Sequence, residues 1–284
     1  MIVISLQSQV VYGYAGNTAA VPVLQAAGLT VLHVPTTMLS NTPHYPEFSA
    51  MPVQAEHVRS LLDGVMKRIA PGEVAAVLTG WMGSADIVAV AADFIRELKA
   101  RHPGVIYLCD PVMGDEASGL YVDPACAEAI ARELVPLGDI LKPNEFELAR
   151  LVDGAGGSTI ERLCALAGPK RRPVIVSSVA DEAGMIGTLA GTGPDDVWRI
   201  RTPRLSPALT GTGDVLTARF LAAWLDGERL PEAMSLAVSG IYAVIEAAEH
   251  AGDTEMPLPR VMRQVLAPAK RFTAERVAPG PASA

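Results

Sequence analysis

The residues Gly211-Thr212-Gly213-Asp214 stand directly before an apolar run, residues 215–225. A helix is predicted to begin here, so its first N–H groups and its dipole point at the spot that the small residues leave uncovered. That spot suits an anion such as a phosphoryl group in transfer. Asp214 has the wrong sign to bind phosphate, but it can take a proton from a hydroxyl that attacks phosphorus. Alternatively, the glycines only form a tight turn and Asp214 only favours the helix N-terminus.

Upstream of this stretch, short apolar runs typical of strands alternate with longer segments typical of helices. The alternation predicts an α/β fold with a mostly parallel central sheet and helices on both faces. The strand-like runs are residues 2–6, 30–34, 75–78, 105–108, 140–141, 174–176 and 185–189. The helical segments are residues 17–27, 53–69, 86–100, 124–134 and 145–151, and downstream the pattern is helical through residue 223, then at 232–249 and 258–265.

No linker rich in Ser, Gly or Pro divides the chain. Residues 1–277 are therefore predicted to form a single domain. Residues 278–284 read Ala-Pro-Gly-Pro-Ala-Ser-Ala and are expected to be a disordered tail.

The composition limits the partners and the compartment. The chain has 284 residues, half of them hydrophobic, and a net charge of −8, which argues against nucleic acid or an anionic membrane as the main partner. Residues 1–46 lack Asp, Glu, Lys and Arg, yet no apolar run there reaches the roughly 18 residues that a membrane span needs. Three cysteines without a CxxC pair suit a reducing compartment, so a soluble cytoplasmic protein is expected.

Polar motifs follow the ends of successive predicted strands. Because ligands bind beyond the carboxyl ends of the strands in an open parallel sheet, these motifs are predicted to share one active-site rim. They are Ser8, Thr79-Gly80-Trp81-Met82-Gly83-Ser84, Asp110-Pro111-Val112-Met113-Gly114-Asp115, Lys142-Pro143-Asn144-Glu145-Phe146-Glu147 and Ser177-Ser178.

Two pairs of polar residues on this rim are candidates for a metal site. Asp110 and Asp115 could hold Mg²⁺, its waters or a monovalent cation near phosphates, or they could simply end a strand in a turn. Asn144 and Glu147 have the spacing that places both on one face of a helix start, where they could reach a metal–water shell. They could equally cap the helix.

Three loops could surround a small ligand. Residues 8–17 combine hydroxyls, amides and two tyrosines without charge, which suits a neutral or zwitterionic aromatic ring. Residues 41–45 form a polar and aromatic loop that could close over it, although His44 could be an ordinary surface residue. Trp81 could stack on a flat ligand or serve in packing. Residues 114–119 could form a mobile flap that excludes water.

Taken together, these motifs resemble pyridoxal kinases of the ribokinase-like superfamily. The resemblance rests on residues 6–13, which read Leu-Gln-Ser-Gln-Val-Val-Tyr-Gly, on the four motifs at residues 79–84, 110–115, 142–147 and 211–214, and on their order along the chain to about residue 250. It implies a three-layer α/β/α fold and ATP-dependent phosphorylation of the 5′-hydroxyl of pyridoxal, extending to pyridoxine or pyridoxamine, in vitamin B6 salvage. It also implies Mg²⁺, a monovalent cation such as K⁺, and a homodimer.

The resemblance also implies a role for each matching residue. Asp214 would be the catalytic base, and Gly211, Thr212 and Gly213 would form the anion hole. Ser8, Thr42, Pro43, His44 and Trp81 would surround the substrate ring with Asp214. Asp110, Lys142, Asn144, Glu147, Ser177 and Thr212 would serve the nucleotide, and Asp110, Asp115 and Glu147 the metal.

The chain departs from the family pattern at three positions. Gln9 stands where His is common, Trp81 where Tyr is usual, and Ser177 where many members carry Lys or Thr. The first two departures bear on the preferred vitamer and the third bears on nucleotide affinity. Two alternatives stay open: a hydroxymethylpyrimidine kinase of the same superfamily, and a non-catalytic protein that binds a B6 vitamer or a nucleotide.

Overall fold

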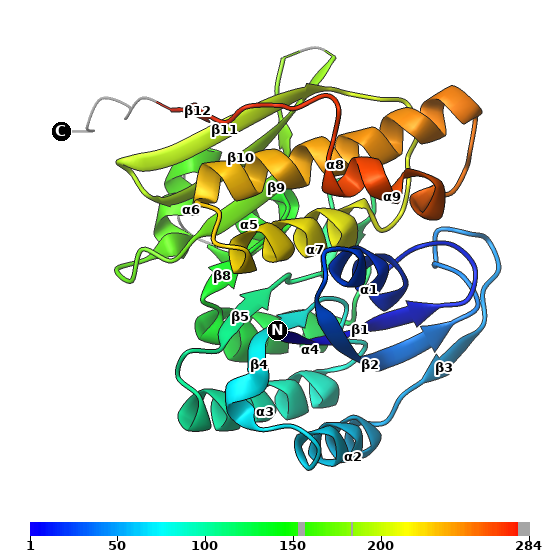
Figure 1. Cartoon of the computed structure of the whole chain (residues 1–284), viewed down its shortest axis with the longest axis vertical. Coiled ribbons are helices and arrows are strands. Elements are labelled where there is room, and N and C mark those ends of the chain that lie inside the picture. The colour runs from blue at the N-terminus through cyan, green and yellow to red at the C-terminus, as the bar shows by residue number, and fades with distance from the viewer. Residues whose placement is uncertain (153–156, 183, 278–284) are drawn as a thin grey trace.

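One ten-stranded sheet forms the centre of the molecule (Figure 1). The computed structural model describes residues 1–152, 157–182 and 184–277. The strand order is β12-β11-β10-β9-β8-β5-β4-β1-β2-β3, in which the neighbours from β9 to β2 pair in parallel and the outer strands pair antiparallel. The strands are β1 (Ile2–Val10), β2 (Thr30–Leu39), β3 (Ala50–Pro52), β4 (Val74–Thr79), β5 (Ile106–Cys109), β8 (Ile140–Leu141), β9 (Val174–Ala180), β10 (Met185–Gly193), β11 (Asp196–Pro203) and β12 (Glu275–Arg276), with a separate hairpin of β6 (Gly114–Asp115) and β7 (Gly119–Leu120).

Helices cover both faces of the sheet, which confirms the predicted three-layer α/β/α arrangement. One face carries α1 (Asn17–Ala26), α7 (Thr212–Leu225), α8 (Leu230–Ala251) and α9 (Leu258–Leu266), which lie together in Figure 1. The other face carries α2 (Ala55–Met66), α3 (Ala85–Arg101), α4 (Pro124–Ala129), α5 (Glu145–Leu151) and α6 (Thr159–Ala167). Central strands such as β1 are therefore buried on both sides, which explains their nearly continuous apolar runs.

Several elements differ from the sequence-based prediction. β1 continues beyond residue 6 to Val10, because the polar side chains there are satisfied inside the protein. Gln7 Nε2 donates to Ser5 Oγ at 3.0 Å, and Ser5 Oγ donates to Asn17 Oδ1 at 2.7 Å. Ser8 therefore lies within β1 and Ser177 within β9, whereas the sequence placed both after a strand. The prediction missed β3, β11, β12, the β6–β7 hairpin and α6, and the predicted tail at residues 278–284 lies outside the described residues.

The helix α8 is the one described helix long and apolar enough to cross a membrane, by length and composition. It has 22 residues, and 61% of its most apolar window is buried inside the protein. It packs between α7 and α9 (Figure 1). This burial accounts for its composition, since a helix that is hydrophobic all round belongs to a protein core as readily as to a membrane.

Gly240 permits the close contact between α8 and α9. A Cβ atom at this position would lie 2.6 Å from the carbonyl oxygen of Val265. We expect Gly240→Ala to lower the free energy of unfolding by about 1–3 kcal/mol, because the backbone of α9 must move to relieve the overlap. Thermal and urea unfolding of the purified variant measure this effect.

The matched control is Gly64→Ala in α2, where nothing lies within 4 Å of the added methyl group. This exchange should stabilise the protein by about 0.5–1 kcal/mol through helix propensity. Equal stability of the two variants would contradict the close contact between α8 and α9.

Candidate active site

The N-terminus of α7 forms the centre of the site. Gly211 caps this helix with φ +82°, and a Cβ atom there would lie 1.9 Å from the carbonyl oxygen of Tyr14, so only glycine fits. The helix begins at Thr212, and Val215 is the first residue whose N–H bonds back to Gly211. The N–H groups of residues 212–214 have no acceptor inside the helix and are free to bind an anion.

Asp214 lies in the first turn of α7 and is tied to the loop after β1. The N–H of Gly16 donates to Asp214 Oδ2 at 2.8 Å. A Cβ atom at Gly16 would lie 2.4 Å from Ser8 Oγ, so Ser8 is the next neighbour on this side. Burial raises the pKa of Asp214 to about 6, and the charge of Asp110 acts in the same direction. A carboxylate with this pKa is deprotonated at neutral pH and is a stronger base than an ordinary aspartate.

Asp110, at the end of β5, forms a buried ion pair with Lys142, at the end of β8. Lys142 Nζ donates to Asp110 Oδ2 at 2.8 Å, and both side chains are at most 5% exposed. The hydroxyl of Thr217 on α7 donates to the same oxygen at 2.7 Å. Burial alone would lower the pKa of Lys142, but the charges of Asp110 and Glu147 outweigh it and hold the pKa above its ordinary value. The amine is therefore an ammonium ion.

Asn144 and Glu147 form a capping box at the start of α5. Asn144 Oδ1 accepts from the N–H of Glu147 at 2.8 Å, and Glu147 Oε2 accepts from the N–H of Asn144 at 2.9 Å. Glu147 Oε1 also accepts from the N–H of Met113 at 2.8 Å, and Asn144 Nδ2 donates to Gly114 O at 2.8 Å. Burial, followed by the charge of Asp110, raises the pKa of Glu147. The pair thus fixes the loop after β5 against α5.

The segment predicted as a mobile flap forms the β6–β7 hairpin. Asp115 Oδ1 accepts from the N–H of Ser118 at 2.7 Å, which tightens the turn. Tyr121 follows the hairpin and is 45% exposed, and partial burial, followed by the charges of Glu147 and Asp110, raises its pKa. Its N–H donates to Met113 O at 3.1 Å, which joins it to the loop that Glu147 fixes, a contact that the sequence did not reveal.

The loop after β2 lies against the segment that precedes the anion hole. The hydroxyls of Thr42 and Thr210 lie 2.6 and 2.8 Å from His44 Nδ1, so His44 joins this loop to the residue before Gly211. Tyr45 donates from its hydroxyl to Glu255 Oε1 at 2.5 Å, and this bond raises the pKa of Tyr45 to about 12. The loop is thereby held in place at His44 and at Tyr45.

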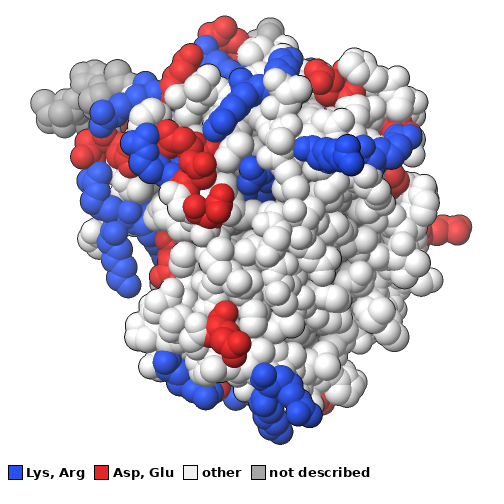
Figure 2. All heavy atoms as spheres, in the orientation of Figure 1, with Lys and Arg blue, Asp and Glu red and all other residues white. Residues whose placement is uncertain are grey.

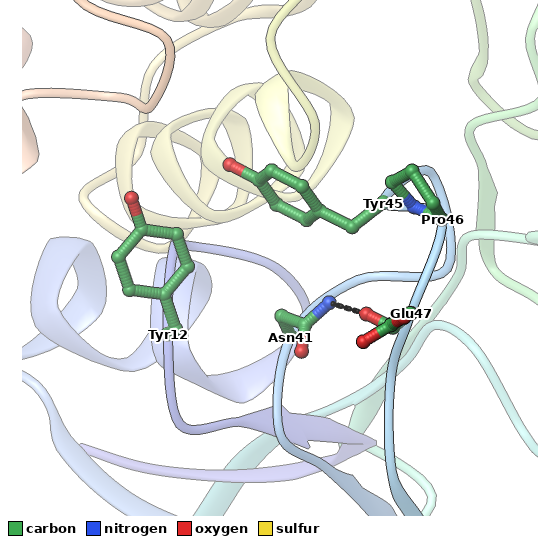
Figure 3. A pocket seen from close by; sticks show the side chains of 5 residues that line it. All are labelled: Tyr12, Asn41, Tyr45, Pro46 and Glu47. Atoms are coloured by element: carbon green, nitrogen blue, oxygen red, sulfur yellow. Dashed lines mark hydrogen bonds between the residues drawn. The ribbon is translucent and has the colours of Figure 1, made fainter.

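A cavity of about 480 Å³ lies beside this loop (Figure 3). The rings of Tyr12 and Tyr45 meet edge to face with centroids 6.0 Å apart, and Asn41 Nδ2 donates to Glu47 O at 2.9 Å. The lining residues are Tyr12, Asn41, Tyr45, Pro46 and Glu47. Asp214 is not among them, so this cavity adjoins the site without containing its centre.

Three predicted residues remain, namely Pro43, Trp81 and Ser177. Pro43 stands between Thr42 and His44 in the closing loop. Trp81 packs partly buried against the core, and its carbonyl oxygen accepts from Thr36 Oγ1 at 2.6 Å. Ser177 lies in β9, where its N–H donates to Pro143 O at 3.2 Å, beside the motif that begins at Lys142.

No group of three His, Cys, Asp or Glu side chains in the described residues is arranged to hold a metal ion by itself. Both oxygens of Glu147 already accept backbone hydrogen bonds. Asp110 Oδ1 and Asp115 Oδ2 accept none from the described residues and are free for a hydrated ion. This donor set fits Mg²⁺, which keeps several waters and binds through one or two carboxylates and substrate phosphates.

Sequence reasoning missed the contacts that join distant segments. Gly16 and Asp214 are 198 residues apart, and Thr217 and Asp110 are 107 apart. Thr210 directly precedes the motif at residues 211–214 but was not part of it, and Glu255 lies outside every motif. Only the start of the apolar run after Asp214 signalled that Thr217 would lie one turn into α7.

The fold and this site define a small-molecule kinase of the ribokinase-like class. A family model for phosphomethylpyrimidine kinase matches residues 12–259. A pyridoxal kinase of Leifsonia xyli is 34% identical over 98% of this chain and 100% of its own length, and one of Rubrobacter xylanophilus is 36% identical over 97% of each. A pyridoxal kinase of Leishmania donovani, solved with ADP and pyridoxamine, has a TM-score of 0.88 at 26% identity and covers 98% of this chain and 99% of its own. The chain belongs to the phosphomethylpyrimidine kinase family, and the three relatives named here, which it matches along nearly its whole length, are pyridoxal kinases.

The pKa of Asp214 leads to a testable pH dependence of phosphoryl transfer. As the pH falls through about 6, Asp214 becomes protonated and can no longer act as a base. We expect kcat/KM to fall about tenfold for each pH unit below this value. Initial rates between pH 5 and 8 measure the profile.

The matched control is Asp63→Asn, which removes an exposed carboxylate on α2. This variant should keep the wild-type profile, including any limb that comes from the substrate. A flat wild-type profile from pH 5 to 7 would contradict the assignment of Asp214 as a base with a raised pKa.

Proposed function

We propose that this protein transfers the γ-phosphoryl group of ATP to the 5′-hydroxyl of pyridoxal and forms pyridoxal 5′-phosphate. The observation that carries the proposal is the partly buried Asp214 in the first turn of α7, beside N–H groups that have no acceptor in the helix. A primary alcohol is a poor nucleophile until it loses its proton, and phosphoryl transfer depends mainly on positioning and charge stabilisation. Asp214 can remove the proton, and the N–H groups at the start of α7 can position the phosphoryl group and stabilise its charge. The names of the relatives support pyridoxal as the substrate.

In this mechanism, Asp214 takes the proton of the 5′-hydroxyl. The N–H groups that follow Gly211, at Thr212 and Gly213, bind the transferring phosphoryl oxygens. Ser8, adjacent to Gly16, bonds the pyridine ring. The loop of Thr42, Pro43 and His44 covers the ring from the side of Thr210, and Trp81, in the segment that follows β4, is proposed to bound the pocket. Pyridoxine and pyridoxamine carry the same hydroxymethyl group and are further proposed substrates.

The nucleotide lies on the side of the rim formed by β5, β8 and β9. Lys142 and Asn144 begin the segment between β8 and α5, and Ser177 lies beside it in β9. Asp110 and Asp115 would hold a hydrated Mg²⁺, which when bound would offset the charge of the nucleotide phosphates. Glu147 supports this side by fixing the N–H of Met113.

The family resemblance also implies a monovalent cation. Asp110 does not offer such a cation a site as it does a hydrated Mg²⁺. The oxygen of Asp110 that faces α7 already accepts from the ammonium of Lys142 and the hydroxyl of Thr217. No step of the mechanism is therefore assigned to K⁺.

A second candidate is a hydroxymethylpyrimidine kinase. The description of the matching family model favours it, because that family is named for phosphomethylpyrimidine. The substrate again presents a ring hydroxymethyl group, so Asp214 and the anion hole would act in the same way. The uncharged loop around Ser8 does not by itself separate the two rings.

The activity is tested by following pyridoxal 5′-phosphate by absorbance, with pyridoxal, ATP and Mg²⁺. We expect product from the wild type and a loss of about 10²–10⁴-fold in kcat for Asp214→Ala, with ADP affinity kept, because the base acts on the hydroxyl and not on the nucleotide. Product from hydroxymethylpyrimidine alone would favour the second candidate. Vitamer binding without ADP release would indicate a non-catalytic protein.

We also propose that two copies associate around β3, the edge strand of the sheet. Val11, Tyr12, Phe48 and Met51 are exposed near the ends of β1, β2 and β3. Figure 2 shows a broad area without charged side chains over α1 and these strands. Burial of such a surface between two copies would remove apolar area from water.

The association is tested by light scattering after size exclusion. Met51→Glu should convert a dimer to a monomer, because it places a charge in the uncharged surface. The control, Leu61→Glu, changes an equally exposed apolar residue on α2 and should leave the dimer intact. A monomeric wild type would contradict the proposal.

A further inference from the structure

Lys142 occupies an unusual position for a lysine. Its side chain is 5% exposed, and it reaches from the end of β8 towards the N-terminus of α7. Nζ lies 2.8 Å from Asp110 Oδ2 and only 3.2 Å from the point where a Cβ atom of Gly213 would lie. The ammonium therefore sits between the Asp110 carboxylate and the anion hole.

The electrostatic surroundings explain how an ammonium ion is held there. The positive end of the α7 dipole alone would repel a cation. The carboxylates of Asp110, Glu147 and Asp214 lie close enough to stabilise it. Asp110 and Lys142 come from neighbouring parallel strands, β5 and β8, so the backbone fixes the separation of the pair.

A mobile monovalent cation bound to this face of Asp110 would meet a like charge. Asp110 Oδ2 accepts two hydrogen bonds from protein groups, one of them from the ammonium itself. A metal ion such as K⁺ needs several oxygen ligands, whereas Lys142 supplies the same single positive charge from the chain. K⁺ and the Lys142 ammonium are therefore alternatives beside Asp110 Oδ2.

We propose that Lys142 is a built-in monovalent cation, whose ammonium balances Asp110 beside the anion hole and makes nucleotide binding independent of K⁺. The inference rests on the proposed nucleotide site and deepens it. Lys142 acts here through Asp110 and the field of the anion hole, as a positioning residue. Removal of its charge should create a requirement for a soluble cation.

The test measures ADP affinity by isothermal titration calorimetry with Mg²⁺ present. Each protein is titrated in K⁺ and in tetramethylammonium buffers of equal ionic strength, since tetramethylammonium is too large to enter a buried site. For the wild type, we expect the two ADP dissociation constants to agree within about twofold. For Lys142→Ser, which leaves space and an oxygen ligand, we expect ADP binding about tenfold or more weaker in tetramethylammonium and restored by K⁺.

Two further variants isolate the role of the charge. Lys142→Met keeps the length of the side chain but offers no charge and no oxygen, so its ADP affinity should fall in both buffers. Lys99→Ser removes a lysine that is 23% exposed and pairs with Asp139, and this variant should behave as the wild type. A direct readout is the melting temperature, which K⁺ should raise for Lys142→Ser and leave unchanged for the wild type.

A wild type that binds ADP tenfold more tightly in K⁺ than in tetramethylammonium would overturn the proposal, and this arm depends on no variant. Equal ADP affinity of Lys142→Ser and the wild type in tetramethylammonium would also overturn it. Because ADP binding is measured without pyridoxal, a protein that forms no pyridoxal 5′-phosphate but binds ADP equally in both buffers would refute the proposed substrate and keep this inference. A wild type that binds no ADP would refute both.

Discussion

Three carboxylates, those of the buried Asp110 and Glu147 and of the partly buried Asp214, meet at the carboxyl ends of the parallel strands, and the protein around them must offset their mutual repulsion. Charges removed from water are costly unless they are paired or hydrogen-bonded. Each carboxylate is stabilised by a different hydrogen-bond donor. Asp110 accepts from Lys142, Glu147 accepts from backbone N–H groups at the start of α5, and Asp214 accepts from the N–H of Gly16. The three therefore differ in basicity and in role.

The central strands could be predicted because helices bury them on both faces. A strand such as β4 is then almost wholly apolar, which a sequence displays directly. The edge of the sheet carries no such signal. β11 alternates buried and exposed residues, with Arg199 and Arg201 among the less buried positions, and β12 has only two residues. These strands become recognisable only through pairing, of β11 with β10 and of β12 with β11, which the sequence does not show.

The site could be predicted as a rim and not as a set of contacts. The motifs around Asp110, Lys142 and Asp214 each follow a recognisable strand or precede a helix, so their presence at one edge follows from the parallel fold. Which side chain pairs with which depends on strand order. The Lys142–Asp110 pair requires β8 to lie beside β5, and Asn144 and Glu147 turn out to cap a helix as well as to face the site.

The central claim is that a hydroxyl next to Asp214 attacks a phosphoryl group held at the N-terminus of α7. A crystal structure with pyridoxal, Mg²⁺, ADP and aluminium fluoride tests it most directly, since aluminium fluoride mimics the phosphoryl group during transfer. We expect the aluminium fluoride to bind the N–H groups of residues 212–214 and the 5′-hydroxyl to lie within hydrogen-bond distance of Asp214. Aluminium fluoride bound away from α7, or a 5′-hydroxyl that faces a base other than Asp214, would contradict the claim.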